Sequence, residues 1–189
     1  MDNLKKTNET SPDNSSENDN GYVPAGKHES ALYAVYRNRA VNVTLRASSY
    51  ICVIASAVAY LFFLVIKATA NVWDALRFLT VTAIPFVIVT VLRSKIPSKR
   101  PYEIFSFYEK KPKNKTGKSF PSRHVFSIFI IGVMLLWENV AVGLVILGLG
   151  IVLAVARVLL GIHFVRDVVA GALIGAVCGA IGVLLNWLV

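Results

Sequence analysis

The chain has 189 residues, 55% of them hydrophobic, and a mean hydropathy of +0.58. This composition is too apolar for an ordinary water-soluble domain and is typical of a membrane protein of one domain. The net charge of +9 lies mostly between apolar segments, which argues against a nucleic-acid partner and favours anionic lipid headgroups or a phosphorylated substrate.

The N-terminal part of the chain divides into two segments. Residues 1–27 are rich in Asn, Ser, Asp, Glu and Lys, with little to bury, so we expect a disordered polar tail. Residues 28–45 carry apolar side chains at helical spacing together with arginines, which predicts an amphipathic helix in the membrane interface. A short soluble helix explains the same spacing almost as well. Residues 46–189 then form the membrane domain.

The membrane domain contains apolar stretches of about 20 residues, the length that crosses a bilayer. The run from Val125 to Ile162 is too long for one span, and its single polar break, Glu138-Asn139, predicts a tight hairpin. The fold class is therefore all-α, an integral-membrane helical bundle of about five transmembrane helices with the interfacial helix before them. We place the spans at Ala47–Ile66, Asp74–Leu92, Ser122–Trp137, Val140–Leu160 and Val168–Leu188.

The last span carries Gly171, Gly175 and Gly179, a repeat of small residues every four positions. Such a stripe lets two helix backbones approach closely. Packing against a neighbouring helix is a sufficient explanation for these glycines.

Three short polar clusters each lie where a hydrophobic segment begins or ends: Arg93 to Pro101, Pro121 to His124, and Arg157 to Asp167. With five spans, these positions all return to the same face of the membrane, and the N-terminus lies on that face too. The tryptophans fall at the opposite face, as expected of an aromatic belt: Trp73, Trp137 and Trp187.

The loop between Arg93 and Arg123 carries ten Lys or Arg residues against two Glu residues. The three arginines of this set suit phosphate binding, so we do not count them toward membrane orientation. Seven lysines remain. Loops rich in Lys and Arg are usually cytoplasmic, which places this loop in the cytoplasm. We therefore expect a multi-pass protein of the cell membrane whose active face is cytoplasmic.

The clusters suit a phosphate dianion. Arginine keeps its charge, and its fork of donors matches phosphate geometry. Such donors matter most when a transition state spreads charge over the equatorial oxygens. Backbone N–H groups at the helix start after Pro121 would add an anion site. The candidates for phosphate binding are Arg93, Arg100, Arg157 and Ser122.

His163 and Asp167 are four residues apart, which places them on one face of a helical turn. A carboxylate bonded to one ring nitrogen leaves the lone pair of the other nitrogen free to attack phosphorus. His124 would protonate the departing alkoxide and later activate water. Each residue alone has an ordinary structural explanation, since an Arg at a helix end is usually an interface anchor. The return of three clusters to one face favours a site.

These motifs resemble the type 2 phosphatidic acid phosphatase superfamily, which also includes the vanadium haloperoxidases, over about residues 45–188. Its signature is Lys-x6-Arg-Pro, Pro-Ser-Gly-His and Ser-Arg-x5-His-x3-Asp, and the spacing within each motif matches. The resemblance implies a helical membrane bundle and a phosphohydrolase that works through a phosphohistidine without metal or cofactor. It implies His163 as nucleophile, Asp167 as its partner and His124 as general acid. It implies phosphate binding by Arg93, Arg100, Ser122 and Arg157.

Three positions depart from the signature: Arg93 stands where Lys is usual, Ala156 where Ser is usual, and Arg123 where Gly is usual. A positive φ at Arg123 would cost roughly 1–2 kcal/mol, so we expect helical or bridge backbone there. The Arg123 side chain could hold a second phosphate or another anionic group. Many family members have six spans, so we expect this chain to have one helix fewer upstream of the first motif. Many bacterial relatives also have outward-facing sites, which conflicts with the charge argument.

We expect a membrane lipid phosphatase that removes phosphate from a lipid monoester or diphosphate. The resemblance implies three candidate substrates: phosphatidic acid, phosphatidylglycerophosphate and undecaprenyl diphosphate. The alternative is a catalytically degenerate relative that binds or moves anionic lipids, and the three substitutions leave this alternative open. Halide oxidation with bound vanadate would use the same site, but nothing in so small a membrane chain favours it. The sequence does not specify an oligomeric state.

Overall fold

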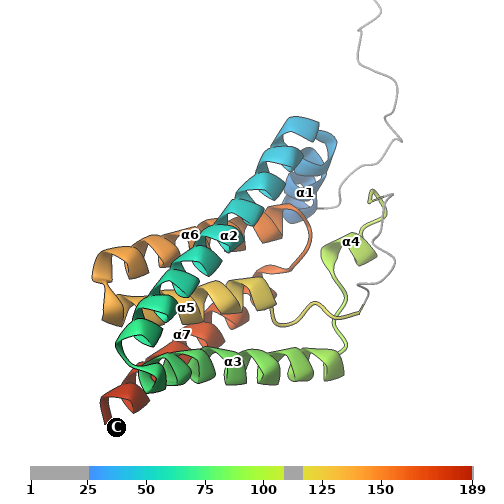
Figure 1. The fold of residues 1–189 in the computed structure, drawn as a ribbon. Helices are drawn as coiled ribbons and strands as arrows, with labels where there is room; N and C mark the ends of the chain where they lie inside the picture. Colours follow the sequence, from blue (N-terminus) through green and yellow to red (C-terminus); the bar gives the residue numbers. More distant parts are fainter. Residues whose placement is uncertain (1–25, 109–116, 189) are drawn as a thin grey trace, which may run out of the picture.

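The structure, a computed structural model, describes residues 26–108 and 117–188, without the side chains of residues 186–188. These residues are helical apart from loops and one isolated bridge between Ser98 and Lys118 (Figure 1), which confirms the all-α prediction. The predicted tail, residues 1–27, lies almost wholly outside this description. The helices are α1 (Lys27–Arg37), α2 (Arg39–Ala70), α3 (Val72–Lys95), α4 (Pro101–Ile104), α5 (Arg123–Glu138), α6 (Val140–Leu159) and α7 (Val165–Leu188).

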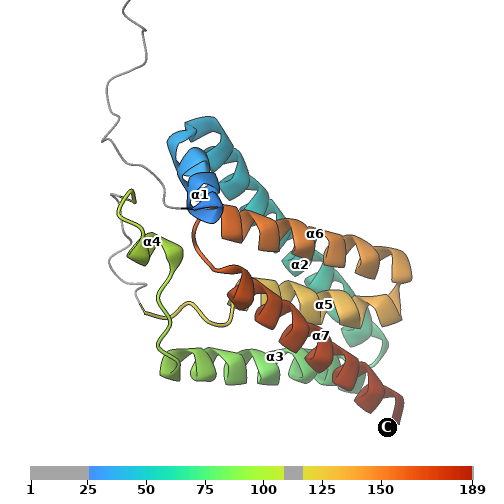
Figure 2. The same ribbon diagram turned by 180° about the vertical axis from the view of Figure 1, so that it is seen from behind.

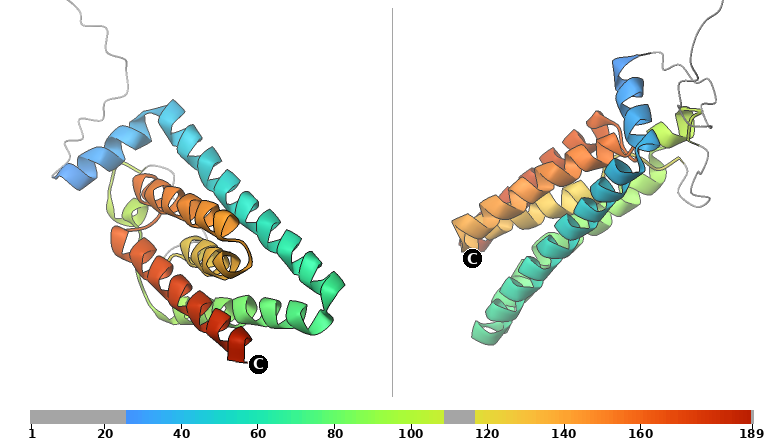
Figure 3. Two further views of the ribbon diagram at one scale, coloured as in Figure 1. Left: turned by 90° about the vertical axis from the view of Figure 1, so that its left-hand side faces the viewer. Right: turned by 90° about the horizontal axis from the view of Figure 1, so that it is seen from above.

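Helix α5 lies at the centre of the bundle, and α2, α3, α6 and α7 surround it (Figure 3). Many of its side chains are accordingly buried: Val125, Phe126 and Leu135 have no exposed surface. They pack with the buried faces of the surrounding helices into an apolar core. Among the described residues, the Asp, Glu, Lys and Arg side chains therefore lie at the ends of the bundle or on its outer surface.

Four of the described helices, α2, α3, α6 and α7, are long and apolar enough to cross a membrane. Helix α5 has 16 residues, so it is about 24 Å long, less than the hydrocarbon core of a bilayer at about 30 Å. The membrane bundle is thus confirmed, and the count of five spans is not. On the outer faces, Ile54, Phe62 and Leu173 are 61–62% exposed, as expected of side chains in contact with lipid.

The segment predicted as one interfacial helix, residues 28–45, is divided in the structure. Helix α1 ends at Arg37, and α2 begins after Asn38, whose side chain accepts a hydrogen bond from the Val41 N–H at 3.2 Å. This cap starts a new helix that continues into the first span. Leu32 of α1 is buried against the aromatic residues that follow α4, so α1 packs on the protein rather than lying alone.

The predicted hairpin at Glu138-Asn139 is confirmed. Helix α5 ends at Glu138, and the Asn139 side chain caps α6 by accepting a hydrogen bond from the Val142 N–H at 3.1 Å. Lys67 at the end of α2 lies 2.9 Å from the Glu138 carboxylate. Figure 2 shows this turn at the end of the bundle opposite α4.

The glycine stripe of α7 faces α5, as the spacing predicts. A Cβ atom at Gly171 would lie 2.7 Å from the Ser122 carbonyl oxygen, and one at Gly175 would lie 2.5 Å from the Phe126 carbonyl oxygen. Only glycine fits such a close approach of two backbones. The stripe therefore sets the first turn of α7 directly beside the first turn of α5.

Candidate active site

The three polar clusters meet at the end of the bundle next to α4 (Figure 1). Arg93 is in the last turn of α3 and Arg157 in the last turn of α6, while Ser122 precedes the first turn of α5 and Asp167 is in the first turn of α7. The Ser122 N–H donates to the Asp167 carbonyl oxygen at 2.9 Å. The alternating direction of the helices brings these ends together, as the sequence predicts.

Two buried arginines hold the loop before α5. Arg93 donates from Nη1 to the Pro121 carbonyl oxygen at 3.0 Å and from Nη2 to the Lys118 carbonyl oxygen. Arg100, just before α4, donates to the same Lys118 carbonyl oxygen at 3.3 Å. Both arginines are 7% exposed. Arg93 therefore fixes the course of the loop, a task that the sequence motif did not reveal.

The same loop is also fixed by backbone pairing. The Ser98 N–H donates to the Gly117 carbonyl oxygen at 3.0 Å, and the Ser119 N–H donates to the Ser98 carbonyl oxygen at 2.9 Å. The Gly117 N–H donates in turn to the carboxylate of Glu103 at 3.1 Å. Ser119 is thus held from the backbone, with its side chain fully buried.

The His163 backbone takes its position from the end of α6. Gly161 has a φ of +65°, the left-handed conformation that commonly ends a helix, and the His163 N–H donates back to the Arg157 carbonyl oxygen at 3.3 Å. A Cβ atom at Gly161 would lie 2.0 Å from the Tyr108 hydroxyl, so both the conformation and the space require glycine. His163 itself precedes α7 and is not part of a helical turn, which corrects the helical spacing expected for His163 and Asp167.

Asp167 lies beside His163 because it belongs to the first turn of α7. Its Oδ2 accepts a hydrogen bond from the Phe164 N–H at 3.1 Å, an arrangement typical of a carboxylate near a helix N-terminus. Arg166 Nε lies 3.5 Å from the other carboxylate oxygen, Oδ1. The Asp167 side chain has no exposed surface. The Phe164 N–H, the positive charge of Arg166 and the helix N-terminus all favour the ionised carboxylate.

The contact between His163 and Asp167 includes a third residue. The distance from His163 Nδ1 to Asp167 Oδ2 is 3.6 Å, whereas Ser119 Oγ lies 3.2 Å from His163 Nδ1 and donates a hydrogen bond to Asp167 Oδ2. Sequence reasoning missed Ser119. It lies three residues before the Ser-Arg-His run in a loop, where spacing along the chain gives no indication of contact.

The His163 imidazole is uncharged at neutral pH. Burial lowers its pKa to about 4, and the positive charges of Arg100 and Arg93 act in the same direction, while the Asp167 carboxylate opposes them. A neutral imidazole keeps a lone pair on one ring nitrogen. His163 therefore has the protonation state that nucleophilic attack requires.

Several buried donors at this end have no hydrogen-bond partner among the described residues: Arg100 Nε, Arg157 Nε and Ser122 Oγ. The Ser122 hydroxyl does not cap α5, so the first N–H groups of that helix have no side-chain acceptor. Buried donors are normally satisfied. Their shared need for an acceptor fits a tetrahedral anion held next to His163.

Arg123 and His124 form the first turn of α5. Arg123 is helical, which confirms the backbone expected there, and its side chain is half-buried. The His124 side chain is exposed and lies within electrostatic range of Arg157 and His163. All eight candidate residues are therefore at one end of the bundle. The most accessible of them is His124, which is consistent with contact to water and a leaving group.

Comparison with known proteins points to one family. Residues 74–188 match the PAP2 superfamily. No curated protein matches the sequence. Among solved structures, LpxE from Aquifex aeolicus superposes with a TM-score of 0.64 at 21% identity, covering 82% of this chain and 92% of LpxE. A PAP2-type phosphatidylglycerolphosphate phosphatase from Bacillus subtilis superposes with a TM-score of 0.54 at 20% identity, covering 86% and 93%. At these identities the two structures support the fold.

Proposed function

Because the chain belongs to the PAP2 superfamily, whose match covers more than half of its length, we propose that it is a membrane lipid phosphatase that acts through a phosphohistidine. The observation that carries the proposal is the group of unpartnered buried donors, from Arg100, Arg157 and Ser122, next to the neutral imidazole of His163. Donors of this kind bind the nonbridging oxygens of a phosphate and stabilise the charge that they gain in the transition state.

The reaction has two steps. His163 Nε2 attacks phosphorus, the bond from phosphorus to the leaving oxygen breaks, and His124 gives its proton to the departing alkoxide. Desolvation and the neighbouring arginines lower the pKa of His124 to about 4, so this step requires the negative charge of the bound phosphate to return the proton to His124. His124 then takes a proton from water, and the hydroxide displaces His163 from phosphorus, which releases inorganic phosphate. The arginines neutralise the equatorial oxygens in both steps. The enzyme ends each cycle in its starting protonation state.

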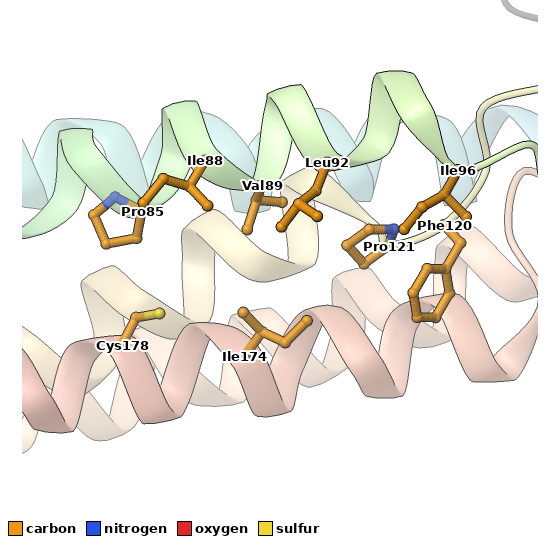
Figure 4. A pocket seen from close by; sticks show the side chains of 9 residues that line it. All are labelled: Pro85, Ile88, Val89, Leu92, Ile96, Phe120, Pro121, Ile174 and Cys178. Atoms are coloured by element: carbon orange, nitrogen blue, oxygen red, sulfur yellow. The ribbon is translucent and has the colours of Figure 1, made fainter.

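An apolar groove beside the site supports a lipid substrate over a soluble one. It runs between α3 and α7, from Phe120 and Pro121 next to the site to Pro85 and Cys178 deeper in the bundle (Figure 4). Leu92 and Pro121 line the groove. Arg93 is the next residue after Leu92 and donates to the Pro121 carbonyl oxygen. The groove therefore begins beside the proposed phosphate-binding groups. A hydrocarbon chain of the substrate fits it. The remaining lining residues are Ile88, Val89, Ile96 and Ile174.

Filling this groove should impair lipid turnover alone. We expect Ile174→Trp to lower kcat/KM for a long-chain lipid phosphate by roughly ten-fold, because displacing about two methylene groups from apolar contact has that effect. Turnover of p-nitrophenyl phosphate, which has no hydrocarbon chain, should be unchanged. Leu173→Trp is the matched control, since Leu173 points outward from the same turn of α7 and is 62% exposed. Equal effects of the two variants on the lipid would contradict a chain-binding groove.

The substrate classes to compare are phosphatidic acid, phosphatidylglycerophosphate and undecaprenyl diphosphate. The protein purified in detergent should release phosphate from at least one of them, and the relative kcat/KM values identify the class. If the wild-type protein binds these lipids yet releases no phosphate from any, the enzymatic proposal fails and a lipid-binding role replaces it. Phosphate release by His163→Ala at the wild-type rate would contradict the phosphohistidine mechanism.

The active end faces the cytoplasm in this proposal. Among the described residues, that end carries exposed cations, including Lys95, Lys99 and Lys118, while the charges of the opposite end, such as Lys67 and Glu138, are paired. This asymmetry supports the positive-inside orientation. A single cysteine at position 99, in a chain with Cys52 and Cys178 replaced by alanine, should react with an impermeant maleimide only after cell lysis. Labelling in intact cells would contradict the cytoplasmic orientation and place the active end outside.

A further inference from the structure

We propose that Ser119 is a positioning residue for the nucleophile, and that the Asp167 carboxylate acts on the His163 imidazole through the Ser119 hydroxyl. This proposal rests on the proposed role of His163. It adds a third member to a couple that the sequence motif presents as two residues. The three side chains are 0–2% exposed, so bulk water does not compete for the hydrogen bonds between them.

Distances favour the indirect connection. The 3.6 Å between His163 Nδ1 and Asp167 Oδ2 exceeds the 2.7–3.2 Å range of N–H···O hydrogen bonds. Ser119 Oγ is 3.2 Å from His163 Nδ1 and is hydrogen-bonded to the same Asp167 Oδ2. The hydroxyl therefore bridges two groups whose direct separation of 3.6 Å is longer than an ordinary hydrogen bond.

The number of available protons fixes the direction of these bonds. An ionised carboxylate only accepts, and a serine hydroxyl has one proton to give. Ser119 must give that proton to Asp167, so its oxygen can only accept from His163. The proton of the neutral imidazole is consequently on Nδ1. The lone pair is then on Nε2, the nitrogen that attacks phosphorus.

The same chain responds to the charge of the intermediate. When Nε2 bonds to phosphorus, the ring becomes positive and its Nδ1–H becomes a stronger donor. Ser119 Oγ accepts from this N–H while its own proton points to the carboxylate, so the negative charge of Asp167 polarises the bridge. Without Ser119, no acceptor lies within 3.5 Å of Nδ1 among the described residues.

The position of Ser119 does not depend on this network alone. Its N–H donates to the Ser98 carbonyl oxygen at 2.9 Å, and Arg93 binds the carbonyl groups of Lys118 and Pro121 on either side of it. The backbone of the loop should thus remain in place when the hydroxyl is removed. A side-chain substitution at Ser119 therefore tests the bridge with little change of the fold.

The proposal is tested first on the wild-type enzyme. The enzyme is labelled with nitrogen-15 histidine and studied by NMR in detergent at neutral pH. The signals of His163 are assigned by comparison with His163→Ala, and they should show protonation on Nδ1. Protonation on Nε2 would overturn the proposal without any substitution at Ser119. This result says nothing against the phosphatase activity, which is assayed separately. A failure of the bridge is thus distinguishable from a failure of the proposed function.

Variants then separate the hydrogen bond from packing. Ser119→Ala and Ser119→Cys should both lower kcat by roughly 10- to 100-fold, the effect of losing a hydrogen bond to a charged group, with little change in KM. Ser119→Ala should also give a mixture of His163 tautomers, and Ser119→Thr, which keeps the hydroxyl, should restore a single tautomer. Full activity of Ser119→Cys would show that only volume matters, and would overturn the bridge. If instead His163→Ala keeps its activity, the proposed function fails whatever Ser119 does.

Discussion

Replacing His163 with alanine is expected to lower phosphate release by roughly 10,000-fold or more, because the loss of a nucleophile removes the reaction path and not only one contact. The imidazole is 2% exposed and neutral, next to donors that need an anion. The measurement is kcat for the best lipid of the panel in detergent. Binding of the lipid should persist, since the arginines and Ser122 remain.

His28→Ala is the matched control for this substitution. His28 is outside the site, in α1, where its ring stacks on Phe164 with the centroids 6.4 Å apart. We expect activity close to that of the wild type. Robust phosphate release by His163→Ala, with His28→Ala normal, would contradict the assignment of the nucleophile.

The second large effect is expected for His124→Ala, which should lower kcat for a lipid phosphate by roughly 100- to 10,000-fold, the range of general acid–base catalysis. The loss should be much smaller in the first step with p-nitrophenyl phosphate, because its phenolate leaves without needing a proton. The phosphoenzyme should then accumulate, since water attack still lacks its base. Rapid-quench measurement of nitrophenol release should show a burst followed by a slow steady state.

A matched test of the charge in this region is Arg166→Ala. Arg166 is exposed: its Nε lies 3.5 Å from Asp167 Oδ1, its Nη2 donates to the Ser98 hydroxyl at 3.5 Å, and its guanidinium lies over the Phe164 ring. The Arg166 guanidinium itself is open to water, which weakens its effect on Asp167, so this variant should release phosphate without a burst. An equal loss in the first step, leaving-group release, for the lipid and nitrophenyl substrates of His124→Ala would contradict the role of His124 as general acid.

The parts of the fold that depend on neighbouring residues along the chain were predictable. The hairpin at Glu138-Asn139 follows from a polar pair in an apolar run, and the close packing of the last span on a neighbouring helix follows from the spacing of Gly171, Gly175 and Gly179. The spacing did not identify that neighbour as α5. Both are short-range signals, since a cap and a small-residue stripe act over one or two turns. The convergence of the three clusters followed from the order of the helices.

The parts that depend on contacts through loops were not predictable. Ser119 bonds to residues more than forty positions away, and its place is set by Arg93, which binds the carbonyl groups of the loop. No periodicity in the sequence records such a contact. The apolar content of α5 predicted a fifth span, and this stays a prediction because the helix has only 16 residues.

The most direct test of the account is to locate the phosphate on the enzyme during turnover. Wild-type and His124→Ala proteins are mixed with a substrate carrying a radioactive phosphate, quenched in alkali, digested and mapped by mass spectrometry. The account predicts a phosphoramidate on His163 that is stable in alkali, labile in acid and more abundant in His124→Ala. Phosphate release at the full rate with no label on His163, or with the label on another residue, would contradict it.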